Sequence, residues 1–516
     1  MDNVSTVKPA PAAALPPLVE NPRLRLMVFL FLMTAMFMAT LDNQIVATAL
    51  PTIVGEFGQL ERFGWVGSAY LLASSAVMPI YGKLGDLFGR KPVFMTAVFI
   101  FTVGSLVCGL AVSMDTLIAA RVLQALGGGG IMVSIFSINA DLFAPRERAR
   151  YQSYSSLVLM ASGAVGPVLG GTLSDLFGWR SIFLVNLPIG IVVLTGLAFM
   201  LPYRRPHRRP KIDYAGAALL AAAIASVVLW ADSGQLFGSL VAPESLAIVA
   251  VGFACLVGFV LVERRVVEPV VPLSLFSDPT FGLLLVVSLC SGAVGIGTVN
   301  YVALFLQTTT GLSPSMAGML FIATTGGIAI GSLSAGRIIS ITGRYKIFSI
   351  ASMATGIVAM GIFSLIGVGT PVPVIAAIML LHGMGIGVGQ QVPVIGVQNT
   401  ARAGDVGAAT GAVTLTRMGG ASIGISIYGA VVAAGVARTG TGLPGIGSID
   451  ELTPKALSAL SPEMQARVGE IYAGAFHPMF LAAALICVVG LSAAFALRNV
   501  RLPVARTAGV ATAAAD

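Results

Sequence analysis

Two charged side chains lie inside long apolar stretches of the sequence, where they could take part in proton exchange. Asp42 stands in the run LDNQIVATALP, and no other acidic residue falls in the interior of an apolar stretch. A carboxylate there costs on the order of 2.5–3.5 kcal/mol, so Asp42 must face a cavity or a partner, where it could gain and lose a proton near neutral pH. Arg121, in RVLQALGGGG, keeps its charge at any accessible pH. The two residues therefore predict a proton site with a fixed cation, or else a structural pair that only holds helices together.

A charged, glycine-rich turn, GKLGDLFGRK at 82–91, separates two further apolar stretches. By itself such a turn is also typical of a simple hairpin between two membrane helices. Its skeleton returns as GRIISITGRYK at 336–346, where the basic residues are kept and Ser340 stands in place of the acid. A repeat half a chain away indicates two halves built on one plan. The residues of the first copy that we single out are Gly82, Asp86, Gly89, Arg90 and Lys91.

Glycines and a proline are concentrated in the stretch GAVGPVLGG at 163–171. Proline bends a helix and glycines let neighbouring helices approach closely, so the stretch predicts either a gating contact or plain small-residue packing. Its candidate residues are Gly163, Gly166, Pro167, Gly170 and Gly171.

A second cation in an apolar stretch, Arg417 in TRMGGASIG, has no partner that the sequence identifies. Two such arginines against one carboxylate do not favour a cavity tuned for cations. The stretch LHGMGIGVG at 381–389 repeats LQALGGGG and puts His382 where Gln124 stands; a buried histidine can titrate, but it is also commonly structural. The candidate cavity residues are Asn43, Gln44, Gln124, Asn300, Gln307, His382, Gln390, Gln391 and Arg417.

Several classes of protein are disfavoured by what the sequence lacks. It contains no HExxH, GxSxG or Walker-type GxxxxGK[ST] motif, and no clustered His/Cys ligand set. The four cysteines lie far apart in apolar stretches, which predicts neither a disulfide nor a metal site. We expect no enzymatic activity, no metal and no cofactor. No segment is long enough for a soluble nucleotide-binding domain, so an ion gradient is the expected source of energy.

The elements that must position these residues are membrane-spanning helices. The chain of 516 residues is 56% hydrophobic and only 10% charged, with a mean hydropathy of +0.92. Runs of about 20 apolar residues, each long enough to cross a bilayer as a helix, recur along it. The expected spans are 26–50, 63–82, 92–112, 115–139, 151–173, 180–201, 214–231, 243–262, 280–306, 315–336, 346–367, 372–397, 406–436 and 474–497.

The basic residues support this count of fourteen spans. With the N-terminus inside, 23 of the 30 Lys and Arg residues fall on the inner side, which is the positive-inside pattern. The net charge of +8 therefore reports topology rather than a nucleic-acid partner, and both termini are expected in the cytoplasm. The first apolar run is expected to be a retained span rather than a signal peptide.

The spacing of the repeated turn predicts six spans, an inserted pair and six more spans. The expected divisions are a disordered tail at 1–22, a bundle at 23–202, a basic linker at 203–212, the inserted pair at 213–264, a second bundle at 265–500 and a tail at 501–516. The outer loop at 437–473 carries two helix starts, Thr453-Pro454 and Ser461-Pro462-Glu463, and is expected to form a small helical cap.

Taken together, these motifs resemble those of the major facilitator superfamily, and within it the fourteen-span drug:proton antiporter branch. LDNQIVATALP, GKLGDLFGRK, RVLQALGGGG and GAVGPVLGG match in order, and GWRSIFLVNLPIG and RMGG also resemble that branch. The resemblance covers residues 25–500. It implies two six-helix bundles that rock around a central cavity, with Asp42 and Arg121 in proton coupling, the 82–91 turn as a conformational switch and 163–171 as the antiporter motif.

The resemblance further implies a proton-coupled multidrug exporter of amphipathic toxic compounds, acting as a monomer in a bacterial inner membrane and conferring antibiotic resistance. Some members of the branch that recognise cationic drugs carry extra acids in second-half spans, and this chain has none there, which leaves room for neutral, zwitterionic or anionic compounds. Three alternatives stay open: export of one endogenous metabolite such as an antibiotic, siderophore or lipid, a proton symporter, and a membrane sensor or membrane-embedded enzyme.

Overall fold

Almost all of the described chain is α-helix. The computed structural model describes residues 18–57, 63–204, 213–231, 233, 241–266, 268–312, 314–402, 404–439 and 461–502. The N-terminal tail up to residue 17, most of the basic linker, the stretch 440–460 with the Thr453-Pro454 helix start, and the tail from 503 lie outside these described residues.

The helices follow the order of the expected spans. The first bundle consists of α1 (Pro22–Phe57), α2 (Phe63–Phe88), α3 (Arg90–Gly109), α4 (Met114–Leu142), α5 (Pro145–Phe177), α6 (Ser181–Leu184) and α7 (Asn186–Met200). The inserted pair is α8 (Tyr214–Ala231) and α10 (Pro243–Glu263), followed by the short 3-10 helix η2 (Leu273–Ser277). The second bundle consists of α11 (Pro279–Gly295), α12 (Val299–Thr308), α13 (Pro314–Thr342), α14 (Lys346–Phe363), α15 (Val372–Thr400), α16 (Val406–Thr439) and α18 (Pro462–Ala496).

Nine of the described helices are long and apolar enough to cross a membrane. The count of fourteen spans stays a prediction, although each expected range coincides with a described helix or with a broken pair, as α6–α7 and α11–α12 do. The helix start at Ser461 is real, but it begins α18 itself, with Ser461 Oγ accepting from the backbone N–H of Met464 at 3.4 Å. This start therefore lengthens the last span beyond 474–497 and does not open a separate cap.

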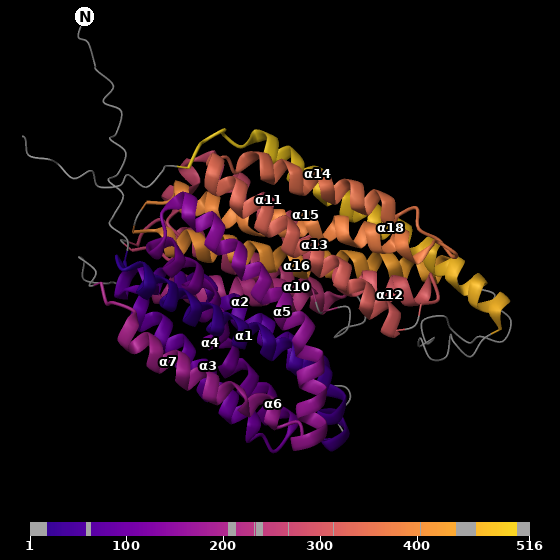
Figure 1. Cartoon of the computed structure of the whole chain (residues 1–516), viewed down its shortest axis with the longest axis horizontal. Helices are drawn as coiled ribbons and strands as arrows, with labels where there is room; N and C mark the ends of the chain where they lie inside the picture. The colour runs from indigo at the N-terminus through magenta and orange to yellow at the C-terminus, as the bar shows by residue number, and fades with distance from the viewer. Residues whose placement is uncertain are drawn as a thin grey trace, which may run out of the picture.

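The two bundles meet at one end of the molecule and diverge toward the other (Figure 1). We call the end that carries the 82–91 turn the turn end, and the opposite one the far end. The contacts between the bundles are made mainly by α2 with α16 and by α5 with α13, and α4 with α16 and α5 with α15 add to them. Within a bundle, glycines allow near-contact of main chains: a Cβ on Gly127 of α4 would lie 2.3 Å from the backbone nitrogen of Phe101 on α3. Such close packing sets the positions of the side chains on both helices.

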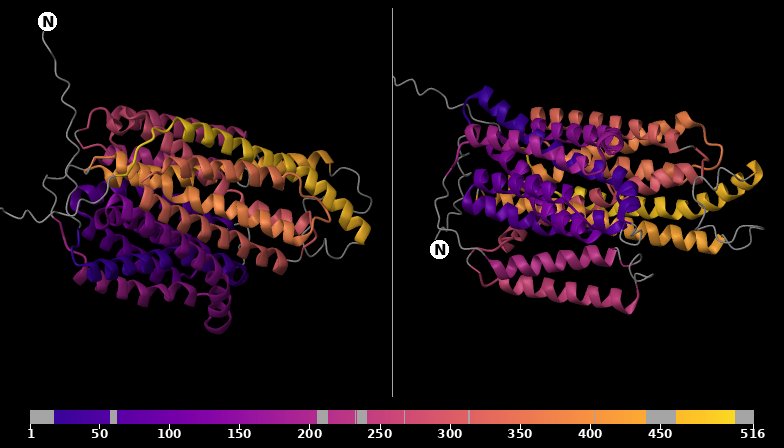
Figure 2. Two further views of the ribbon diagram at one scale, coloured as in Figure 1. Left: turned by 45° about the horizontal axis from the view of Figure 1, so that its top comes forward. Right: turned by 90° about the horizontal axis from the view of Figure 1, so that it is seen from below.

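The inserted pair lies beside the two bundles and not within either of them. α8 and α10 pack on one another, and α8 contacts α2 of the first bundle and α16 of the second (Figure 2, right). We call residues 264–278, which lead from α10 to α11, the connector. The pair thus spans the junction of the bundles from outside and returns the chain to the turn end.

Candidate functional site

The carboxylate of Asp42 lies in the core of the first bundle and is surrounded by donors from other helices. Asp42 is 1% exposed and forms an ion pair with Arg121 of α4, which is equally buried. Gln124 Nε2 and Asn186 Nδ2 each donate to Asp42 Oδ1 at 2.8 Å. Since every one of these donors comes from another helix, α1, α4 and α7 are joined at this one carboxylate.

Arg121 is held from several sides in addition to its pairing with Asp42. Its guanidinium lies 4.2 Å from the centre of the Tyr70 ring on α2, a cation–π contact. It donates from Nη1 to Gln124 Oε1 at 2.6 Å and from Nη2 to Asn43 Oδ1 at 3.2 Å. The structure thus brings together four of the predicted residues, Asp42, Asn43, Arg121 and Gln124, as one buried polar cluster. The one carboxylate and the one guanidinium of this cluster neutralise each other, and their hydrogen bonds fix the relative positions of the helices.

The charged turn joins the two bundles at the turn end. Asp86 Oδ1 and Oδ2 accept from the backbone N–H groups of Gly407 and Ala408, at 3.1 and 3.0 Å. These groups are in the first turn of α16, where the helix dipole favours a negative charge. The main chains nearly touch there, because a Cβ on Gly82 would lie 2.3 Å from the carbonyl oxygen of Gly407. Only glycine permits this approach.

Arg90 connects Asp86 to a third helix. It pairs with Asp86 at 2.5 Å and with Asp141, at the end of α4, at 3.2 Å. Asp86 lies beyond the apolar part of α2, and burial raises the pKa of its carboxyl to about 6, against the opposing effects of Arg90 and the two backbone donors. Lys91 donates to the carbonyl of Ala198 at 2.6 Å, and Gly89 adopts φ 92°, a conformation that favours glycine. Gly82, Asp86 and Arg90 therefore meet the start of α16, whereas Gly89 and Lys91 lie beside the end of α7.

Other contacts hold the bundles together at the turn end. Arg146 of α5 donates to the carbonyls of Leu502 and Ile341, each at 3.1 Å. Deeper in the molecule, Gln398 Nε2 donates to the carbonyl of Phe136 at 3.1 Å. Among the described residues, the hydrogen bonds between the bundles lie in the half of the molecule next to the turn end.

A row of polar side chains on α5, α13, α15 and α16 lies farther from the turn end and also joins the two bundles. Ser156 of α5 donates to Gln390 Oε1 at 3.2 Å and accepts from Gln391 Nε2 at 3.0 Å. Ser332 of α13 also donates to Ser156, at 2.9 Å. Arg417 of α16 belongs to the same level, since its Nη1 lies 3.5 Å from the carbonyl oxygen of Gln390. Three predicted cavity residues, Gln390, Gln391 and Arg417, thus belong to this polar row.

The glycine–proline stretch of α5 faces α1 through one of its glycines. A Cβ on Gly166 would lie 2.4 Å from the Cβ of Gln44, whereas one on Gly163 would be 4.0 Å from Gln44 Nε2 and one on Gly171 would meet nothing within 4 Å. The helix bends by 41° between its segments Pro145–Gly163 and Val168–Ser174, a bend that contains Pro167 and is followed by Gly170. Of the three glycines of this stretch whose surroundings are described, Gly166 is the one that makes the close approach to α1.

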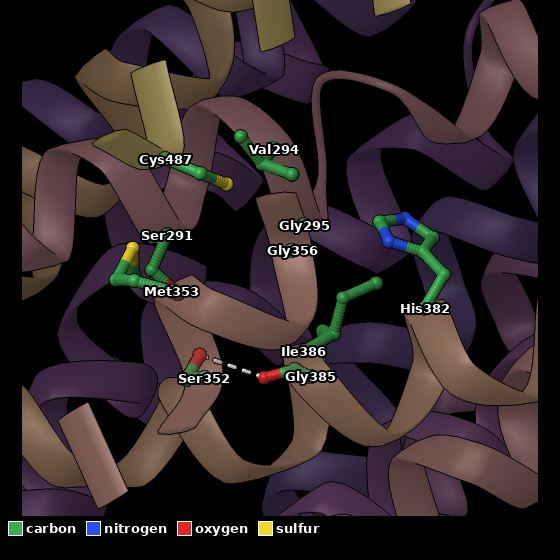
Figure 3. Close-up of a pocket in the computed structure, with 10 residues that line it drawn as sticks. All are labelled: Ser291, Val294, Gly295, Ser352, Met353, Gly356, His382, Gly385, Ile386 and Cys487. Atoms are coloured by element: carbon green, nitrogen blue, oxygen red, sulfur yellow. Dashed lines mark hydrogen bonds between the residues drawn. The ribbon is translucent and has the colours of Figure 1, made fainter. Parts of the chain in front are cut away.

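His382 lies inside the second bundle and away from the junction. Its Nε2 is 3.3 Å from Thr298 Oγ1, and its ring packs edge-on against Phe363. It lines a cavity of about 20 Å³, enough for about one water molecule, together with residues of α11, α14 and α18 (Figure 3). Asn300 and Gln307 lie on α12. Among the described side chains, those of His382 and Gln307 make no contact with the polar row around Ser156.

Some residues of the site were not singled out from the sequence. Asn186 and Ser105 complete the cluster around Asp42, with Asn186 Nδ2 donating to Ser105 Oγ at 3.1 Å. Asn186 stands within GWRSIFLVNLPIG, which was a usable signal. Asp141, Glu268 and the N–H groups of 407–408 had none, because their importance comes from contacts with residues distant in the chain.

Comparison with known proteins places this architecture in a family. The family model described as Major Facilitator Superfamily matches residues 32–425. An uncharacterized MFS-type transporter of Mycobacterium tuberculosis is 34% identical over 508 residues, which cover 96% of this chain and 73% of the relative. The multidrug transporter protein MdtP of Bacillus subtilis is 30% identical over 405 residues, 78% of this chain and 74% of that protein. The crystal structure of the human organic anion transporter MFSD10 has a TM-score of 0.61 at 15% identity, covering 91% of this chain and all of that one, and this likeness concerns the fold alone.

Proposed function

Because the chain belongs to the Major Facilitator Superfamily, a family of membrane transporters, we propose that it is a proton-coupled exporter of amphipathic toxic compounds. The observation that carries the proposal is the buried cluster of Asp42, Arg121, Gln124 and Asn186. Relatives named as a multidrug transporter and as efflux pumps support the direction of transport.

In this proposal Asp42 is the proton-binding group. With Asp42 ionised, Arg121 is neutralised and α1, α4 and α7 are joined through shared hydrogen bonds. A proton on Asp42 leaves Arg121 without its counter-charge, which favours a rearrangement of these helices. Proton binding and helix movement are then one event, which is what an antiporter requires.

The 82–91 turn acts as the conformational switch. The bundles meet at the turn end, so we assign the structure to the outward-facing state, with the turn end and both termini in the cytoplasm of a bacterial cell; the positive-inside distribution of Lys and Arg supports this orientation. To open the inner side, α16 must move away from Asp86. The two backbone N–H donors of α16 and the Asp86–Arg90 pair must then be hydrated by water. No cofactor is needed, because the proton gradient supplies the energy.

The test uses purified protein in liposomes with an imposed pH gradient and a pH-sensitive dye inside. A lipophilic cation, a neutral drug and an organic anion are added in turn. We expect at least one class to trigger proton movement in the wild type and Asp42→Asn to reduce it at least tenfold, because the amide keeps the shape but cannot carry the proton.

The matched control is Glu244→Gln, which removes an exposed carboxylate from α10 and should leave transport unchanged. Gel filtration and the melting temperature show whether Asp42→Asn is folded. Proton movement that persists in a folded Asp42→Asn protein would refute Asp42 as the coupling residue. No proton movement with any compound in the wild type would contradict a broad-specificity antiporter.

A further inference from the structure

Arg417 is a buried cation without a counter-charge among the described residues. The residue is 9% exposed, and its Nε has no hydrogen-bond partner in the described part of the chain. Its one described hydrogen bond, from Nη1 to the carbonyl oxygen of Gln390, is long at 3.5 Å. Arg121, buried to a similar extent, has Asp42, Gln124 and Asn43 as acceptors. The same kind of side chain is thus neutralised in the first bundle and left unneutralised in the second.

The second bundle supplies no described acidic side chain that could neutralise Arg417. Between Pro279 and Ile449, Asp405 is the only Asp or Glu in the sequence. Asp405 precedes Arg417 by twelve residues, a rise of about 18 Å along a helix. On α18, which packs against α16, the acids Glu463 and Glu470 belong to its first turns at the far end.

The described part of the first bundle offers no free acid at this level either. Asp42 is engaged by Arg121, and Asp86 by Arg90 and the start of α16. An unpaired buried charge is costly, because neither water nor a counter-ion stabilises it. Such a charge is understandable if a ligand supplies the missing partner.

Arg417 stands at the right depth for a transported ligand. It is the twelfth residue of α16 counted from the turn end, about 16 Å along the helix axis. Gln390 and Ser156 lie at nearly the same distance from the turn-end termini of α15 and α5. Between this level and the turn end the bundles are joined by further hydrogen bonds, and the bundles as a whole diverge toward the far end (Figure 1). Arg417 therefore lies at the level of the polar row that joins α5 to α15, farther from the turn end than the contacts of Asp86.

We propose that Arg417 binds an anionic group of the transported compound, and that the compounds are amphipathic organic anions such as carboxylates. The proposal rests on the proposed export function and adds the substrate class. A guanidinium binds a carboxylate through two parallel hydrogen bonds, and Nε is one of the two donors available for that geometry. The neighbouring Gln391 Oε1, which also lacks a described donor, can accept a hydroxyl or amide hydrogen from the rest of the molecule.

The experiment measures binding, without a proton gradient, of 11-(dansylamino)undecanoic acid and of its uncharged methyl ester, by dansyl fluorescence on protein in nanodiscs. The two probes share size and apolar surface and differ in one charge. We expect the wild type to bind the acid at least tenfold more tightly than the ester. Arg417→Gln should bind both equally, at the affinity of the ester, and Arg417→Lys should retain part of the preference. Arg498→Gln, at an exposed arginine near the C-terminus, is the matched control and should behave like the wild type.

A second measurement keeps the test valid if the variant folds poorly. Removing an unpaired buried charge should leave the melting temperature of ligand-free Arg417→Gln equal to or above that of the wild type, while the acid should raise the melting temperature of the wild type only. A wild type that does not prefer the acid, or an Arg417→Gln protein that keeps the preference, overturns the proposal. Because no gradient is used, preference for the acid would stand even if proton-coupled export failed, and export of the acid at the same rate by the wild type and by Arg417→Gln would overturn the anion site alone.

Discussion

At the scale of single residues, the roles of charged side chains in this protein follow from their partners. Asp42 and Arg121 stabilise each other in the first bundle, whereas Arg417 lacks an acid within reach among the described residues. A buried pair is tolerated because each charge solvates the other, and a lone buried charge is costly. In the mechanism that we propose, this difference separates the group that binds a proton from the group that binds an external anion.

A third charged residue, Glu56 near the end of α1, leads to a prediction about pH. It accepts from Trp179 Nε1 at 2.6 Å and pairs with Arg180 at 2.9 Å. The hydrogen bond from Arg180, followed by that from Trp179, lowers the pKa of the Glu56 carboxyl below its usual 4.5. Because the pKa is lowered in the folded protein, the stabilising contribution of Glu56 is present above pH 4.5 and is lost as the pH falls through the lowered value.

We therefore expect the emission of Trp179 to change with a midpoint below pH 4.5, as protonation weakens the hydrogen bond from its indole. The measurement is a fluorescence titration in a Trp65→Phe/Trp230→Phe background, which leaves Trp179 as the only tryptophan. Glu56→Gln should show no such transition. A midpoint at or above 4.5, or a transition that persists in Glu56→Gln, would contradict this role.

At the scale of elements, the inserted pair is attached to the junction through its connector. Lys83, in the charged turn, pairs with Glu268 of the connector at 3.0 Å, and Lys83 is 6% exposed. Glu263 at the end of α10 accepts from the backbone N–H groups of Val270 and Val271, at 3.0 and 3.3 Å, which fixes the path of the connector. A cavity of about 480 Å³ lined by Lys83, Glu263 and Arg402, among others, lies beside these contacts. The inserted pair can thus respond to movement of the turn.

This arrangement predicts the outcome of a charge exchange. Lys83→Glu or Glu268→Lys alone places two like charges in contact and should lower the free energy of unfolding by about 1.5–3 kcal/mol. The double variant Lys83→Glu/Glu268→Lys should recover most of that loss and also recover the transport rate. Denaturant unfolding and the liposome assay measure the two effects. A double variant no more stable than either single one would show that the pair is not a significant contact.

At the scale of the whole molecule, two bundles that touch at one end can alternate only by opening there and closing at the other. The turn-end contacts involve Asp86 of α2 and Arg146 of α5 in the first bundle, and Gln398 of α15 in the second. They would have to break together, because each bundle moves largely as one packed unit. The molecule should therefore switch between two states and should not open gradually.

Spin labels at exposed positions test this expectation. A pair at Phe199 and Ile347, which are 86% and 60% exposed, reports the turn end, and a pair at Val112 and Leu365, 78% and 81% exposed, reports the far end. We expect substrate together with acidification to lengthen the first distance and shorten the second, as two discrete populations measured by pulsed electron resonance. Asp86→Asn should change the ratio of the two populations without creating a third. Distances that change in the same direction at both ends would rule out this rocking movement.

The sequence by itself predicted the helical elements, their order and the family, and it singled out most of the residues that the structure brings together around Asp42 and in the charged turn. This was possible because a membrane helix is decided by the transfer free energy of its own residues, and because motifs such as LDNQIVATALP are contiguous in the chain. Even the helix start at Ser461 was visible locally, and in the structure it is the start of α18.

Only the tertiary structure decided which side chains meet. Asp42 is joined to Asn186 across 144 positions and Asp86 to Gly407 across 321, and nothing in either local stretch specifies the other. The same holds for the unneutralised state of Arg417, for the place of the inserted pair and for the end at which the bundles close. These features depend on packing between helices that are far apart in the chain. The hydrophobicity of a helix predicts that it crosses the membrane, but it does not determine which other helices it contacts.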